Sequence, residues 1–440
     1  MQRRVVITGV GAVSPLGLTS DQMWQGLLEG RCGLGPIRNF DASAFDCKIA
    51  GEVPPFNIRD YVPKSHRKAT KLMSRDIELA VAASHEAVKH SGLISKADEG
   101  KTPTLIPQRT AINYGAGLIA CDLTEMAQSV KLCVTDGKFD IRKWGSEGMQ
   151  TLTPLWLLKY LPNMLPCHVA IIHDIQGPSN TITCGDASSY LAVSEAAEMI
   201  IRGDVETALA GGGETRIHPF GIVRQYLMKR ANCSSNDNPS AACRPFDAQA
   251  AGTVFSEAAG TLVLEDMQTA RHRGASMLAE VAGWGASHSL NPDYTHLEPN
   301  GQAVTYAIET ALQQAGITPD KLDLIIPCGT GIPCDDQAEA IGIQNALGQA
   351  ACVVPVWPTK ALLGHSGAAA GALDLIAAAL AICHGKTGKA VNLDSPTAGC
   401  KLHFLREPLH QPLNYVLCCG YSFGGQCAAV ILKSIKDESQ

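Results

Sequence analysis

The stretch TITCGDASSYLAVSEAAEMIIRGD, residues 181–204, shows the unit from which the fold is built. A strand-like run ends at Thr183, and a helix-like stretch then continues to Gly203. Strands and helices of this kind alternate along the chain. Fully apolar strands with helices between them predict mixed sheets covered on both faces, so the predicted fold class is α/β. The predicted strands lie at 5–8, 111–113, 208–210, 261–264, 324–326 and 429–432, and the predicted helices at 76–91, 187–202, 302–315 and 367–384.

Length and composition exclude several classes of protein. The 440 residues are 45% hydrophobic and 18% charged, which is enough to bury two or three cores at ~100–200 residues per domain. The net charge of −6 and the lack of a basic block argue against nucleic acid as a partner. No uncharged run reaches the ~18 apolar residues of a membrane span.

The 16 cysteines contain no CxxC pair. A structural zinc site is therefore not predicted, and disulfide frameworks belong mainly to short secreted chains. We expect mostly reduced, buried cysteines in a cytoplasmic protein that has no metal and no cofactor.

The chain is predicted to consist of two similar halves, residues 1–270 and 271–440. A charged, glycine-containing stretch at 270–276 marks the seam between them. Each half runs strand, helix and strand and has a glycine-rich segment near its end, at 210–214 and at 423–425. We interpret both segments as turns, and their repetition as weak evidence of an internal duplication.

Two motifs match known signatures only in part. Gly9-Val10-Gly11 follows a strand, but Ser14 stands where a dinucleotide fingerprint has its third glycine, so this segment is interpreted as a tight turn. The segment from Gly364 to Ala368 departs from G-x-S-x-G at its last position and does not predict a serine hydrolase.

Asp186 stands where the strand-like run gives way to the helix. Backbone N–H groups and the helix dipole favour an anion at such a junction. A cysteine there would be a strong candidate nucleophile, whereas an aspartate is a good N-cap. Taken alone, Asp186 is interpreted as a helix cap.

Seven short segments, spread over nearly the whole chain, carry the strongest signal. They are Arg4–Gly17, Gly177–Ser179, Ala210–Glu214, Cys243–Asp247, Gly329–Pro333 with Asp336 and Glu339, Thr359–His365, and Ser422–Gly425. In this order and at roughly this spacing they resemble the FabF-type β-ketoacyl-[acyl carrier protein] synthases. The resemblance implies a thiolase-like fold, in which two similar halves stack as alternating helix and sheet layers, and an obligate dimer.

The resemblance also identifies the positions of the family's chemistry. The family's nucleophilic cysteine corresponds to Asp186, and its first catalytic histidine corresponds to Cys328. The family's lysine and second histidine are retained as Lys360 and His365. Elongation by the usual route should fail, because a carboxylate would form a high-energy anhydride rather than an exchangeable thioester. Cys184 is the only thiol near the nucleophile position and is interpreted mainly as a packed strand-end cysteine.

Other matched positions have also changed. Ala250-Ala251 replaces a pair that is usually Arg-Asp, and Tyr421 stands at the phenylalanine that gates the acyl pocket. The resemblance places Ser422 and Phe423 at the same gate. A basic strip, which is either a contact for an acidic carrier protein or simply a solvated helix face, consists of Lys64, Arg67, Lys68 and Lys71.

This pattern is similar to the chain-length factors, or ketosynthase β subunits, of type II polyketide synthases. The leading hypothesis is a non-catalytic subunit that pairs with a catalytic ketosynthase and, directly or through it, with an acyl carrier protein. An alternative is an enzyme of altered chemistry, either a malonyl-carrier decarboxylase that uses His365 and Lys360 or an acyltransferase that uses Cys184. A binding or regulatory homodimer without a synthase partner also stays open.

Overall fold

A computed structural model describes residues 3–292 and 294–435 of the chain. Its strands are β1 (Val5–Val13), β2 (Leu34–Pro36), β3 (Ile49–Gly51), β4 (Thr110–Ala116), β5 (Val134–Thr135), β6 (Lys138–Phe139), β7 (Ser179–Ile182), β8 (Thr207–Thr215), β9 (Glu257–Asp266), β10 (Ala279–His288), β11 (Leu324–Ile326), β12 (Pro355–Val356), β13 (His403–Phe404), β14 (Tyr415–Tyr421) and β15 (Gln426–Lys433). Its α-helices are α1 (Ser20–Glu29), α2 (Arg75–His90), α3 (Leu123–Leu132), α4 (Ile141–Ser146), α5 (Met164–His173), α6 (Ser188–Arg202), α7 (Pro219–Leu227), α8 (Met267–His272), α9 (Gln302–Ala315), α10 (Pro333–Leu347), α11 (Lys360–Leu363) and α12 (Ala370–His384). Every predicted strand and helix is present, with ends that move by a few residues.

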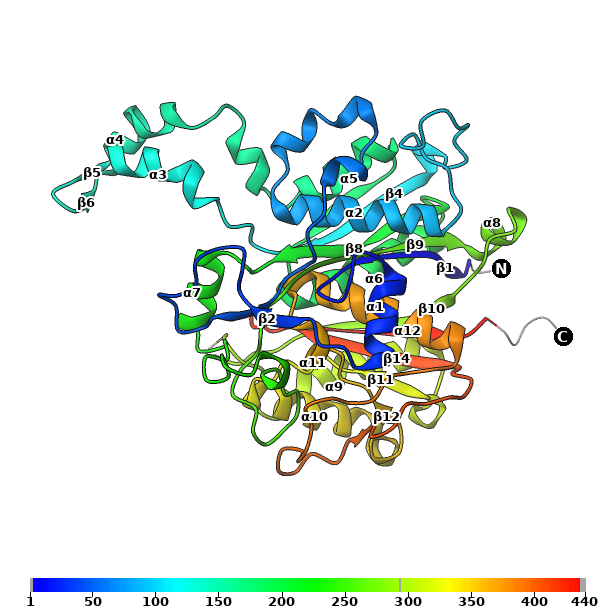
Figure 1. Cartoon of the computed structure of the whole chain (residues 1–440). Coiled ribbons are helices and arrows are strands. Elements are labelled where there is room, and N and C mark those ends of the chain that lie inside the picture. The colour runs from blue at the N-terminus through cyan, green and yellow to red at the C-terminus, as the bar shows by residue number, and fades with distance from the viewer. Residues whose placement is uncertain (1–2, 293, 436–440) are drawn as a thin grey trace.

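The elements form stacked layers of helix and sheet (Figure 1). Helices α2 and α5 cover the outer face of the strands β7, β4, β8, β9 and β1, whereas α9 and α10 lie beyond the second set of strands. Helices α6 and α12 lie between the two sets. This is the thiolase-like arrangement, so the predicted fold is confirmed.

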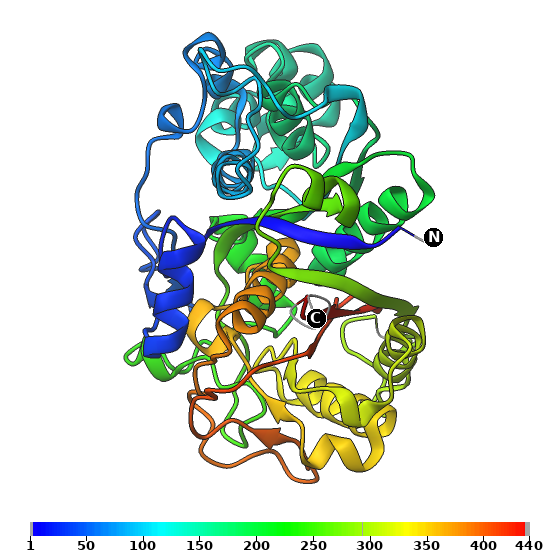
Figure 2. The ribbon, with the colours of Figure 1, turned by 90° about the vertical axis from the view of Figure 1, so that its right-hand side faces the viewer.

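The two sets of strands meet along one narrow seam. The two sets together form one sheet of eleven strands in the order β13-β12-β11-β14-β15-β10-β1-β9-β8-β4-β7. Only two residue pairs, Val6 with Glu280 and Ile7 with Ala279, join β1 to β10 across the seam. Figure 2 shows these two strands side by side across the middle of the molecule. The carboxyl ends of β7, β8, β11 and β14 carry the residues of the site described below.

Two predicted turns are instead strands. Gly9 and Gly11 lie within β1, and the glycines at 211–213 lie within β8. A Cβ at Gly11 would overlap the backbone oxygen of Ala83 in α2. These glycines therefore permit close approach of backbone to backbone, which the linear sequence does not distinguish from a turn. The segment 423–425 does form the turn between β14 and β15.

Helix α12 fills the middle of the molecule. Together with the preceding short turn it forms an apolar stretch, Gly367–His384, with a mean hydropathy of 1.7. Length and composition alone would allow this stretch to cross a membrane, but 89% of it is buried inside the protein. It packs against both sets of strands as a core helix.

Candidate functional site

Asp186 is positioned by the junction that the sequence predicted. Strand β7 ends at Ile182, a single 3₁₀ turn covers Gly185–Ala187, and α6 follows and ends at Arg202 with Gly203 as its C-cap. Gly185 adopts a φ of +54°, which favours glycine. The capping interpretation of Asp186 is wrong: the N-cap of α6 is Ala187, and no side chain caps the helix. Asp186 is 2% exposed and turns inward to a partner that the sequence analysis missed.

That partner is Arg216, the residue directly after β8. Its Nη2 donates to Oδ1 of Asp186 at 2.5 Å, and its Nε donates to Oε1 of Glu214 at 3.0 Å. Oε2 of Glu214 accepts the backbone N–H of Ala368 at 2.6 Å. The Arg216 guanidinium lies 5.4 Å from the ring centroid of Phe255. The nucleophile position is thus held in a buried network.

The charges in this network stabilise one another. Burial raises the pKa of Asp186, but Arg216, His365 and Arg230 lower it by more, so the pKa lies below its ordinary value. Burial lowers the pKa of Arg216, but the carboxylates of Asp186 and Glu214 have a larger opposite effect, so this pKa lies above its ordinary value. Asp186 is therefore a paired carboxylate near neutral pH.

His365 lies beside Asp186 and is neutral near pH 7. Its backbone N–H donates to Val254 at 2.8 Å, which fixes the loop, and its side chain is 1% exposed. Burial lowers its pKa to about 3, although Asp186 opposes this shift. Nδ1 lies 3.7 Å from Oδ1 of Asp186, and neither ring nitrogen forms a hydrogen bond within the described part of the chain. This pair is a contact rather than an ion pair.

Cys328 follows β11 and occupies a buried corner of the site. Its backbone N–H donates to Glu339 at 2.7 Å, and the N–H of Gly329 donates to the other oxygen at 2.8 Å. Burial, together with the charge of Glu339, raises the pKa of the Cys328 thiol well above its usual value. The thiol is thus neutral and a weak hydrogen-bond donor.

Lys360 begins α11 and points into the interior. Its Nζ forms an ion pair with Asp374 and donates to the backbone oxygen of Pro327 at 3.3 Å. Asp374 also accepts from the Tyr190 hydroxyl at 2.7 Å and from the Thr359 hydroxyl at 2.8 Å. Burial lowers the pKa of Lys360, but Asp374 and the other acidic groups around it together raise it by more, so the pKa lies above its ordinary value. Lys360 is thus engaged by buried polar partners.

The predicted gate residues lie next to these groups. Tyr421 ends β14 at 1% exposure, and its hydroxyl lies 3.3 Å from that of Thr330. Ser422 is buried against Gly185, the residue before Asp186. Phe423 lies under the guanidinium of Arg230, 5.8 Å from ring centroid to Cζ. Three segments far apart in sequence therefore meet at the site.

Cys184 does not have the environment of an activated thiol. Its side chain is partly buried, and burial raises its pKa. Catalytic thiols instead show lowered pKa values, beside cations or at helix N-termini. Its backbone N–H donates to the Ser188 hydroxyl at 2.9 Å, which holds it at the strand end.

The basic strip is solvent-exposed, but it does not form an α-helical face. Lys64, Arg67, Lys68 and Lys71 are all exposed, and they lie on or beside two consecutive 3₁₀ turns, Lys64–His66 and Ala69–Leu72.

A separate pocket with a volume of about 530 Å³ lies on the other side of the end of β8. Thr215 and Ile217, the neighbours of Arg216, line it together with Arg75 and the buried Glu257, which form an ion pair. None of the residues predicted from the sequence lines this pocket.

The fold is that of a ketosynthase, and Asp186 occupies the position predicted for the nucleophile. The model of the β-ketoacyl synthase N-terminal domain matches residues 2–270, and that of the C-terminal domain matches residues 278–394. The chain belongs to the β-ketoacyl synthase family.

Individual relatives span essentially the whole chain. The 3-oxoacyl-[acyl-carrier-protein] synthase 2 of Coxiella burnetii is 32% identical over 99% of this chain and 100% of its own length. The ishigamide ketosynthase/chain length factor is 27% identical with a TM-score of 0.82, covering 99% of this chain and 100% of that one. A type II polyketide ketosynthase, solved in complex with its acyl-carrier protein and bound to the hexaketide, gives 25% identity, a TM-score of 0.82 and the same coverage.

Proposed function

We propose that this chain is a non-catalytic chain-length-factor subunit, or ketosynthase β subunit, of a type II polyketide synthase or a related acyl-chain synthase. The observation that carries the proposal is the buried ion pair between Asp186 and Arg216 at the nucleophile position. Condensation by this family needs a thiolate there, because the acyl chain is held as a thioester. A carboxylate that is fully paired with a guanidinium offers neither the nucleophile nor the space around it.

The rest of the site supports the same proposal. A neutral buried thiol at Cys328 replaces a histidine that would stabilise the thioester oxygen. Lys360 is engaged by Asp374 and a backbone carbonyl. Of these site residues, His365 has both ring nitrogens without a hydrogen bond within the described part of the chain, and a single donor does not complete the site.

An exposed edge of the sheet supports pairing with a second chain. Strand β7 is the last strand in the order of the sheet, and Ser179 and Asn180 are exposed. An exposed strand edge can pair with another chain through its backbone groups. The segment carrying α3 and α4 extends away from the body (Figure 1), and the region around it has many exposed apolar side chains. They include Leu118, Phe139, Ile141, Met149, Leu155 and Leu157, each at least half exposed.

We infer that the partner is a catalytic ketosynthase and that an acyl carrier protein docks on the pair. A structural neighbour is itself described as a ketosynthase/chain length factor, and another contains a carrier protein. The exposed strip Lys64, Arg67, Lys68 and Lys71 would attract an acidic carrier at low salt. The pocket beside β8 provides space in which the pair could contact the growing chain.

The central experiment compares the chain alone with the chain co-expressed with a catalytic ketosynthase of a type II polyketide synthase. We expect a stable complex that elongates malonyl carrier substrates, and no elongation or acyl adduct for the isolated chain. Elongation by the isolated chain, or failure of the two chains to associate, would contradict the proposal.

Intact-protein mass and carbon dioxide release separate the alternatives. An acyl adduct that disappears in Cys184→Ala would establish the acyltransferase instead. Carbon dioxide released from malonyl carrier, and lost in His365→Ala, would establish the decarboxylase.

The carrier contact has its own test. Replacing all four basic residues of the strip with glutamate should weaken carrier binding at least tenfold at low salt and leave complex formation with the ketosynthase intact. Lys401→Glu, at another exposed lysine, should leave carrier binding unchanged. Equal carrier affinity for the two variants would place the contact elsewhere.

A further inference from the structure

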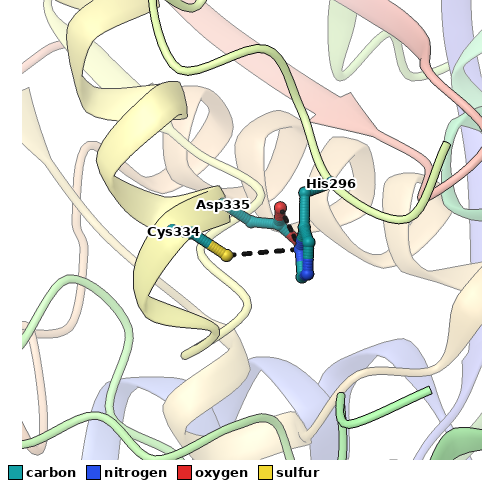
Figure 3. Close-up of side chains that lie close together, drawn as sticks. All are labelled: His296, Cys334 and Asp335. Carbon is teal, nitrogen blue, oxygen red and sulfur yellow. Dashed lines mark hydrogen bonds and ion pairs between the residues drawn. The ribbon is translucent and has the colours of Figure 1, made fainter. Parts of the chain in front are cut away.

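Three metal-ligating side chains converge at the start of α10, outside the network around Asp186 (Figure 3). His296 comes from the loop between β10 and α9, whereas Cys334 and Asp335 lie in the first turn of α10. The Cys334 Sγ lies 3.2 Å from Nδ1 of His296, and Oδ1 of Asp335 lies 3.0 Å from the same nitrogen. The ligand atoms all lie within 4.8 Å of one another.

The sulfur of Cys334 and the carboxylate of Asp335 contact the same imidazole nitrogen. If Nδ1 carries a proton, it donates to Asp335 and cannot accept from the Cys334 thiol. If Nδ1 is unprotonated, it accepts from the thiol and places its lone pair against a carboxylate oxygen. In a Cys–His–Asp catalytic triad the nucleophile and the carboxylate contact opposite nitrogens of the imidazole, whereas Cys334 and Asp335 both contact Nδ1. Sulfur, nitrogen and oxygen atoms within 4.8 Å of one another can be bridged by a single cation.

We propose that His296, Cys334 and Asp335 bind a divalent transition-metal ion, with Zn²⁺ as the expected occupant. Thiolate, imidazole and carboxylate are all zinc ligands, and typical bond lengths place tetrahedral ligand atoms about 3.4–3.6 Å apart. The two distances to Nδ1 need to lengthen by only a few tenths of an ångström. Cys334 is exposed, so its side chain has room to turn toward the ion.

The surroundings of the cluster fit a bound cation. Asp335 is 1% exposed, and its second oxygen accepts from Nη1 of Arg230 at 2.9 Å, which orients the carboxylate. The backbone N–H of Leu297 donates to Oδ1 of the same carboxylate at 3.3 Å. The thiolate and the carboxylate supply two negative charges to a divalent ion, and the carboxylate shares its charge with Arg230. Three protein ligands leave a fourth position for water or another ligand, on the side where Cys334 meets solvent.

A metal ion bound here would connect the loop that carries His296 to the turn at 423–425. Nη1 of Arg230 also donates to the backbone oxygen of Thr295, and its guanidinium lies over Phe423. The backbone N–H of Ser289, at the start of the same loop, donates to Gly425 at 2.7 Å. Metal binding would therefore hold the loop residues 294–297, α10 and the turn at 423–425 together. This role is independent of the proposed subunit function.

The sequence does not indicate this site, because it contains no CxxC pair. The ligands His296 and Cys334 are 38 positions apart and meet only in the folded chain.

Metal titration of the full-length protein tests the site. After treatment with a chelator, the protein should bind one equivalent of Zn²⁺ in competition with a chromophoric indicator, and Co²⁺ should give a thiolate charge-transfer band. Cys334→Ser and His296→Gln should each weaken binding more than tenfold and remove or shift that band. Cys352→Ser, at another exposed cysteine, should bind as the wild type does.

Circular dichroism of each variant establishes that the fold is retained. A wild-type protein without a stoichiometric site would overturn the proposal. Equal affinity in Cys334→Ser and in the wild type would do the same.

Discussion

Asp186 and Arg216 form an ion pair with an Oδ1–Nη2 distance of 2.5 Å, and both side chains are at least nine-tenths buried. The aspartate occupies the position at which we expect the family's nucleophile, and the arginine comes from the end of a different strand. A buried carboxylate without a partner would be costly, so the arginine stabilises the charge of Asp186.

The first prediction concerns this compensation. Arg216→Met should destabilise the protein by about 3–5 kcal/mol, because it leaves Asp186 buried and unpaired. The double variant Asp186→Ala/Arg216→Met should lose less unfolding free energy, since it also removes the Asp186 charge that Arg216→Met leaves unpaired. Urea denaturation of the three proteins measures the difference.

The control for this prediction is an exposed arginine. Arg38 pairs with Glu52 but is 80% exposed, so Arg38→Met should cost about 0–1 kcal/mol. Equal losses of unfolding free energy in Arg216→Met and Arg38→Met would mean that the buried ion pair matters no more to stability than an exposed one.

Much of the site could be predicted from linear motifs, because Asp186, Cys328, Lys360 and His365 each lie within a short recognisable segment. Arg216 could not, since its role exists only where the end of β8 lies beside the turn at 185–187. A charged residue directly after the glycine-rich strand 207–215 was the available signal.

The fold shows the same limit. Strands and helices follow from apolar runs and their lengths, so their approximate positions were predictable. Gly11 and Gly211 were read as turn residues because glycine serves both turns and close approach of backbones. Only the packed structure shows that a neighbouring carbonyl oxygen leaves no space for a Cβ at either position.

The second prediction concerns the hydroxyl that supports Asp374. Tyr190→Phe removes a donor 2.7 Å from this buried carboxylate, and the unfolding free energy should fall by about 1.5–3 kcal/mol. Tyr306→Phe makes the same change on a side chain that is 55% exposed and should stay within about 0.5 kcal/mol of the wild type. Chemical denaturation measures both variants. An unchanged unfolding free energy in Tyr190→Phe would show that Lys360 and Thr359 alone satisfy the carboxylate of Asp374.

The third prediction uses two glycine-to-alanine changes of opposite sign. Gly211→Ala places a Cβ against the backbone oxygen of Gly260 and should cost about 1–3 kcal/mol from overpacking. Gly145→Ala in α4 meets no atom within 4 Å and should gain about 0.5–1 kcal/mol from helix propensity. Thermal and urea unfolding of the two variants give the sign of each change in unfolding free energy. An unchanged value for Gly211→Ala would mean that β8 and β9 can move apart without a loss of stability.

The last prediction is a pH dependence caused by His365. Burial lowers its folded-state pKa to about 3, whereas the unfolded chain binds the proton near the ordinary value of about 6.5. Between these values the unfolded state binds more protons than the folded state. The stability is therefore complete above about pH 6.5 and is lost, by about 1.4 kcal/mol per pH unit, as the pH falls toward 3.

The difference in unfolding free energy between the wild type and His365→Gln isolates this contribution. Between pH 6.5 and 4.5 the wild type should lose about 2–3 kcal/mol of unfolding free energy relative to His365→Gln, because glutamine does not titrate. His410→Gln serves as the matched control at an exposed histidine, and its difference from the wild type should change little over the same range. A His365→Gln difference that is constant with pH would show that His365 is protonated in the folded protein, and hence that it forms a true ion pair with Asp186.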